Sequence, residues 1–173
     1  MQIINLIEFW GKMSDSIIFL YLSFPILFMF HELEEIAFMT EWMNRLKKDK
    51  LGKLPQLFKK LDTPSHQNFT LIVFEEYFLI IIIAGICYLF SYHAFYVALI
   101  ISYNIHILIH VMQAFFLKSY VPGLISGVLS FSILTIILST YINIVDLNLV
   151  LFLTPINLLI VFINLFIIHK IIR

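Results

Sequence analysis

Histidines and carboxylates occur at helical spacings inside stretches that are otherwise apolar. His31, Glu34 and Glu35 lie three and four residues apart in one stretch. His106 and His110 lie four residues apart in another. Side chains at these spacings share one face of a helix. Histidines one turn apart can bind one metal ion, and carboxylates add oxygen ligands that suit zinc, iron or manganese. These five residues are the predicted ligands of a divalent metal, with zinc as the first choice.

Other polar residues are candidates for a catalytic role beside these ligands. Glu75 and Glu76 form a pair in a further apolar stretch, and either is predicted to act as a ligand or a general base. Glu35 and Tyr120 complete the predicted catalytic set. Glu32 lies about 100° around the helix from His31, so it is expected to face a neighbouring helix or a polar cavity. The alternative is a Glu–His network that satisfies these groups without a metal.

The composition indicates where such a site would lie. Hydrophobic residues make up 61% of the 173 residues, and charged residues only 13%. So little polar surface could not cover a soluble protein of this size. A formal net charge of zero gives no attraction to nucleic acid, and a single cysteine excludes a disulfide scaffold. The chain is therefore predicted to be one integral membrane domain, residues 1–173.

The apolar stretches predict an all-α fold, a bundle of five transmembrane helices. Each stretch exceeds the roughly 20 residues that a spanning helix needs. A short interfacial helix is predicted over residues 1–11, and a loop that includes an amphipathic, membrane-surface helix over residues 43–68. The five predicted spans cover about residues 16–42, 69–90, 94–117, 121–142 and 147–172.

The basic residues predict the orientation. Seven of the eleven Lys and Arg residues fall within residues 43–68. Because basic loops stay on the cytoplasmic side, the N-terminus is predicted outside and the C-terminus inside. Counting about 1.5 Å per residue from the span ends places the His and Glu groups at one depth, in the cytoplasmic half of a bacterial cytoplasmic membrane. Charge at this depth costs about 2.5–3.5 kcal/mol per residue, so these groups are expected to be functional.

The start of the fourth span carries a further pattern. Tyr120 is expected at the inner membrane edge, and Pro122 in the first turn of the helix. The free N–H groups there could face an anionic head group or a developing oxyanion, or simply begin the helix. Gly123 and Gly127 form a G-x-x-x-G pair. Such pairs allow close helix packing, within the chain or in a homodimer.

At these residues the chain resembles the HXXEE family of small bacterial and archaeal integral membrane proteins. His31 to Glu35 match its HxxEE motif, Tyr120 to Gly123 match its YxPG motif, and His110 matches the histidine of its NxxxH motif. The asparagine of that motif would fall at position 106, where this chain has His106. The resemblance implies that the motifs form one active site, and it names no substrate.

Three classes of function fit these features. The first is a membrane-embedded, metal-dependent hydrolase that acts on a lipid or amphiphilic substrate from the cytoplasmic leaflet. The second is a metal-free acid–base isomerase, because His and Glu in an apolar pocket can move protons. The third is a proton- or cation-coupled transporter or an accessory membrane subunit. No nucleic-acid partner is expected.

Overall fold

The computed structural model describes residues 17–50 and 63–172, and this part of the chain is all-helical. Five of its helices are long enough and apolar enough to cross a membrane, which makes the chain an integral membrane protein. The interfacial helix predicted at 1–11 and the amphipathic segment predicted within the loop lie outside the described residues. The helices are α2 (Ile17–Lys50), α4 (His66–Leu89), α5 (His93–Leu117), α6 (Leu124–Tyr141) and α7 (Leu147–Ile171), with a short 3-10 helix, η1 (Ile142–Ile144), before α7.

Three helix boundaries differ from the predicted ones by three or more residues, and one of them is the start of α4, which lies at His66 instead of the predicted 69. Helix α2 continues beyond the predicted end at 42, as far as Lys50. Hydropathy marks where the chain leaves the membrane, and a helix of charged residues can continue past that point. Helix α6 begins at Leu124, because Pro122 and Gly123 form a turn before it. Pro122 therefore precedes the helix and does not lie in its first turn.

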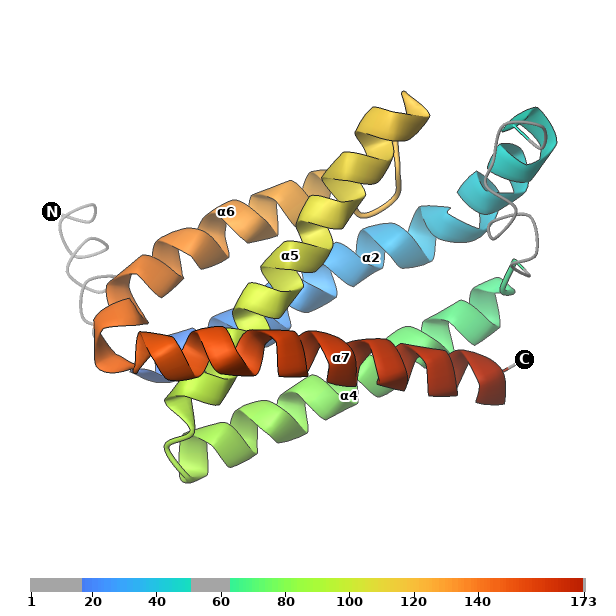
Figure 1. Ribbon diagram of the computed structural model, residues 1–173. Coiled ribbons are helices and arrows are strands. Elements are labelled where there is room, and N and C mark those ends of the chain that lie inside the picture. Colours follow the sequence, from blue (N-terminus) through green and yellow to red (C-terminus); the bar gives the residue numbers. More distant parts are fainter. Residues whose placement is uncertain (1–16, 51–62, 173) are drawn as a thin grey trace, which may run out of the picture.

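The helices pack around a core of aromatic and aliphatic side chains, with α5 crossing the middle of the bundle (Figure 1). Helix α2 packs against α4 and α6, and α5 packs against α6 and α7. Tyr21 and Tyr96 stack with their ring centroids 4.3 Å apart, and Phe24 packs edge-on against Tyr96. These rings lie in the N-terminal halves of α2 and α5. The His and Glu residues lie further along the same two helices.

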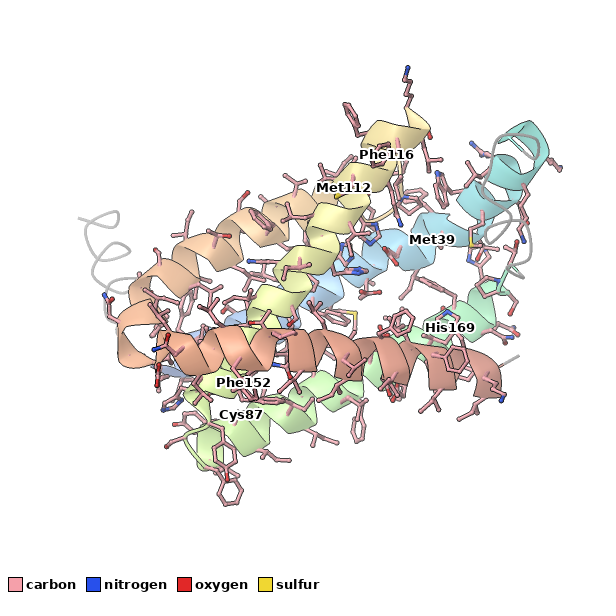
Figure 2. The ribbon with its side chains drawn as sticks, in the orientation of Figure 1. Met39, Cys87, Met112, Phe116, Phe152 and His169 are labelled. Atoms are coloured by element: carbon pink, nitrogen blue, oxygen red, sulfur yellow. The ribbon has the colours of Figure 1, made fainter. Side chains whose placement is uncertain are left out.

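The outer surface of the bundle is apolar. Met112, Phe116 and Phe152 point away from the core on α5 and α7 (Figure 2), and each is more than half exposed. Exposed apolar side chains over whole helices would be unfavourable in water, whereas they are neutral against lipid tails. The surface therefore agrees with the membrane assignment made from helix length.

Candidate functional site

Four donor groups from two helices converge inside the bundle. His31 and Glu35 come from α2, and His106 and His110 come from α5; one ligand atom of each lies within 4.8 Å of all the others. Glu35 Oε1 lies 3.1 Å from His110 Nε2 and 3.6 Å from His31 Nε2. The Nε2 atoms of His106 and His110 lie 2.9 Å apart. The one-turn spacings within each helix thus bring together four of the five predicted ligands, which we call the four-donor group.

His31 is held with one ring nitrogen directed at this group. Its Nδ1 lies 3.0 Å from the carbonyl oxygen of Gly123. A carbonyl only accepts hydrogen bonds, so Nδ1 carries the proton and Nε2 carries the lone pair. His31 Nε2 and Glu35 Oε1 are both buried and have no hydrogen-bond partner among the described residues. Buried polar atoms are rarely left unpaired, and a cation between them would satisfy both.

Gly123 and Gly127 allow the start of α6 to form one wall of the site. Gly123 has a left-handed φ of 80°, and a Cβ there would lie 2.5 Å from His31 Cε1 and 2.7 Å from Glu35 Oε1. A Cβ on Gly127 would lie 3.1 Å from His31 Nδ1. The predicted close packing is therefore made within one chain, against α2. Both glycines are buried there. A homodimer contact through them stays a prediction.

Glu34 lies outside the four-donor group, although it is a predicted ligand. Its carboxylate accepts hydrogen bonds from the Tyr120 hydroxyl, from the backbone N–H of Ser126 at 2.7 Å and from Ser126 Oγ at 2.5 Å. It therefore caps the N-terminus of α6, where a carboxylate is favoured. Because Glu34 occupies this position, these N–H groups are not directed at the anionic head group or oxyanion that the sequence suggested.

Tyr120 fastens the α5–α6 connection to α2. Its hydroxyl donates to Glu34, and its carbonyl oxygen accepts from Trp42 Nε1 at 2.7 Å. Partial burial and the hydrogen bond to Glu34 raise the pKa of the Tyr120 hydroxyl above its ordinary value. The hydroxyl therefore stays protonated and donates its hydrogen bond to Glu34. Tyr120 contacts this carboxylate rather than the four-donor group.

Two further carboxylates lie beside the four-donor group. Glu32 is only 5% exposed, and its Oε1 lies 3.9 Å from His31 Nε2. Glu76, on α4, is close enough for its charge to interact with those of Glu32 and Glu35. Glu75 is directed elsewhere, because its Oε2 accepts a hydrogen bond from Asn164 on α7 at 3.1 Å. Glu76 thus lies beside the site, whereas Glu75 contributes to the contact between α4 and α7.

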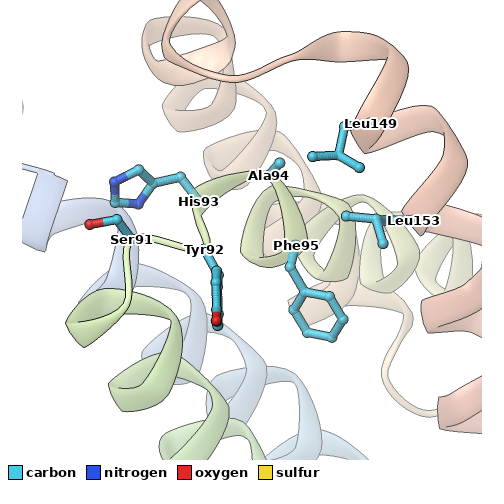
Figure 3. A pocket seen from close by; sticks show the side chains of 7 residues that line it. All are labelled: Ser91, Tyr92, His93, Ala94, Phe95, Leu149 and Leu153. Atoms are coloured by element: carbon cyan, nitrogen blue, oxygen red, sulfur yellow. The ribbon is translucent and has the colours of Figure 1, made fainter.

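A separate pocket of about 300 Å³ lies at the other end of α5 (Figure 3). It is lined by the α4–α5 turn, by the first residues of α5 and by Leu149 and Leu153 of α7, and it shares no residue with the four-donor group. His93, at its edge, has its Nδ1 2.8 Å from the Tyr21 hydroxyl, which donates to the Cys87 carbonyl oxygen. His93 is therefore a hydrogen-bonded packing residue.

A family described as proteins of unknown function with an HXXEE motif matches residues 22–138. No curated protein and no solved structure matches the chain. The matched region includes the whole four-donor group and the connection that holds Tyr120 and Gly123. The resemblance seen in the sequence is confirmed, and the chain belongs to the HXXEE family.

Proposed function

We propose that the chain is a membrane-embedded enzyme that depends on a divalent metal held by the four-donor group. One observation supports this most strongly: three imidazole nitrogens and one carboxylate oxygen converge in the bundle interior within 4.8 Å of one another. Two of these donors, His31 Nε2 and Glu35 Oε1, are buried and have no hydrogen-bond partner in the described part of the chain. This donor set suits zinc, iron or manganese.

The balance of charge also supports a bound cation. Glu32, Glu35 and Glu76 lie close together, and the ion partners of Glu32 and Glu35 within the described residues are His31 and His110. Buried charges are costly unless they are paired. A divalent cation would compensate two of the three carboxylates and would hold the histidines in the neutral form that ligates.

Hydrolysis is the reaction we propose for this site. A bound divalent metal lowers the pKa of a water ligand and so provides a nucleophile near neutral pH. With a metal bound, Glu32 would be the residue to take the proton from that water, because it lies beside His31 and outside the four-donor group. A glutamate that directly follows the first of two ligands one helical turn apart plays this part in H-E-x-x-H metalloproteases. Here the corresponding residues would be His31, Glu32 and Glu35.

The substrate we propose is a lipid or an amphiphile that enters from the cytoplasmic leaflet. The site lies within the membrane-crossing helices, and its Glu35 is about 10 Å along α2 from Trp42. Trp42 and Tyr120 are side chains typical of a membrane interface, and Arg45 and Lys118 lie at the same end of the bundle. Basic residues favour the cytoplasmic side, so we assign this end to the cytoplasm.

Turnover in defined membranes tests this function. The chain would be reconstituted with each major class of bacterial phospholipid and with amphiphilic esters, and products would be followed by mass spectrometry. We expect a hydrolysis product that is lost on chelation and in Glu35→Gln, and that persists in Glu75→Gln, whose side chain contacts Asn164 instead. A metal-loaded, folded protein that hydrolyses none of these compounds would contradict the hydrolase assignment.

The ion pairs favour one other candidate, a metal-free acid–base isomerase. Glu35 Oε1 lies within 4 Å of nitrogens of both His31 and His110, so these pairs alone could satisfy part of the site. In that case the groups would move a proton between two positions of an apolar substrate. This alternative predicts that stability and turnover are unchanged by chelators, whereas the metal enzyme loses both.

A further inference from the structure

Resting on the proposed metal, we infer that the four-donor group binds an ion with more than four ligands, of the Fe²⁺ or Mn²⁺ class. Zinc, the first choice from the residue types alone, prefers four ligands in a tetrahedron. The distinction determines whether the ion keeps positions for water and substrate once all four side chains are bound.

The number of protein donors is the first argument. Catalytic zinc sites use three protein ligands and keep the fourth position for water, whereas sites with four protein ligands are structural. His31, Glu35, His106 and His110 together supply four. An octahedral ion with these four ligands keeps two open positions, which is enough for one water and one substrate oxygen. Iron and manganese accept this coordination number with mixed nitrogen and oxygen donors.

The bundle has no evident need of a structural ion, which is the second argument. Structural zinc stabilises small domains that lack a sufficient core. Here the N-terminal halves of α2 and α5 pack through buried aromatic side chains, including Phe24 and Tyr96. The four-donor group lies beyond that core along the same helices. Its donors are also next to Glu32, a buried carboxylate that a structural site would not require.

The spacing of the donors is the third argument. The distances from His110 Nε2 to His106 Nε2 and to Glu35 Oε1 are 2.9 and 3.1 Å. Ligand bonds of about 2.0–2.1 Å place the corners of a tetrahedron about 3.3–3.4 Å apart. Octahedral bonds of about 2.1 Å place neighbouring ligands about 3.0 Å apart. These two shortest spacings are close to those of neighbouring positions of an octahedron, whereas the 3.6 Å between His31 Nε2 and Glu35 Oε1 is longer than neighbouring positions in either geometry.

Binding strength alone would not distinguish the two geometries, because zinc binds most sites more tightly than iron or manganese does. Cobalt(II) reports the geometry directly. Four-coordinate tetrahedral cobalt absorbs visible light strongly, and six-coordinate cobalt absorbs it weakly. The experiment is the visible spectrum of the purified full chain loaded with Co²⁺ in detergent micelles, with cobalt content measured by elemental analysis on the same sample.

We expect one cobalt per chain with weak, six-coordinate absorption. Intense tetrahedral absorption at the same stoichiometry would overturn this inference and leave the metal-dependent function standing. Failure of a folded chain to bind cobalt would overturn both. His106→Ala should change the spectrum and weaken cobalt binding by at least 10- to 100-fold, the loss typical of residues that merely support a ligand. His169→Ala, at an exposed position on α7, is the matched control and should change neither.

Discussion

The Nδ1 atom of His31 donates a hydrogen bond to the carbonyl oxygen of Gly123, across 92 positions of the chain. A second hydrogen bond, from Tyr120 to Glu34, joins the same two segments. These two hydrogen bonds connect the two sequence motifs, residues 31–35 and 120–123, and we call this contact between the motifs the joint. This joint fixes the tautomer of His31 and brings the backbone of Gly123 against the four-donor group.

Gly123→Ala should disrupt the joint. The new Cβ would overlap His31 and Glu35, and the left-handed φ would be strained. We expect a loss of about 2–4 kcal/mol in the free energy of unfolding, from overpacking and backbone strain together. Thermal unfolding in detergent measures it. Gly85→Ala is the matched control, because nothing lies within 4 Å of its Cβ position, and its helix should be unchanged or slightly stabilised. Equal effects of the two substitutions would contradict this account of Gly123.

Glu34→Ala should loosen the joint while leaving the four donors in place. The backbone N–H of Ser126 would lose its partner at the start of α6, which is worth about 1–3 kcal/mol. A double-mutant cycle with Tyr120→Phe should show that the two losses are not additive, because the side chains share a hydrogen bond. Glu41→Ala, which removes only an exposed ion pair with Arg45, should cost less than about 1 kcal/mol. Additive losses for Glu34 and Tyr120 would show that they act separately.

Tyr120 should make stability depend on pH in the alkaline range. Burial and Glu34 raise its pKa in the folded protein above the unfolded value of about 10. Its contribution is therefore complete below about pH 10 and is lost as pH rises through the folded-state pKa. The unfolding temperature of the wild type should fall more steeply above that pH than the unfolding temperature of Tyr120→Phe. Parallel pH profiles for the two proteins would argue against this role.

Glu32→Gln should separate catalysis from metal binding. Glu32 lies beside His31 but outside the four-donor group, so the amide should retain the metal and lose the base. Removal of a general base typically costs about 10²- to 10⁴-fold in turnover. Turnover and metal content would be measured on the same preparation, with Glu75→Gln as the isosteric control. If Glu32→Gln turned over substrate at the wild-type rate, another residue would be the general base, and Glu76 would be the next candidate.

Helical periodicity was sufficient to predict the paired donors within α2 and within α5. It could not assign Glu34 and Glu35 to their neighbours, since residues three and four positions after His31 lie on opposite sides of it, about 100° apart. Only the packing shows that Glu35 faces α5 and Glu34 faces α6. The offset of about 100° from His31 predicts that Glu32 faces a neighbouring helix or a polar cavity. Glu32 lies only about 60° around the helix from Glu35, which explains its position beside the four-donor group.

The role of Gly123 was only partly predictable. The G-x-x-x-G spacing correctly indicated close packing, but spacing does not show which surface the glycines meet. Pro122 predicts a helix start at residue 121, whereas the turn that contains Pro122 and the left-handed Gly123 places the start at Leu124. The carbonyl of Gly123 as a partner of His31 has no signal in the sequence, since every residue has a carbonyl.

The metal content of the purified chain tests the central claim most directly. The protein would be extracted in detergent, incubated anaerobically with Fe²⁺, Mn²⁺ or Zn²⁺, desalted and analysed for metal by mass spectrometry. The account predicts about one ion per chain, lost in His31→Ala and in Glu35→Gln and retained in His169→Ala. A folded wild-type protein that retains no ion, or one that binds metal equally well in all four forms, would contradict it.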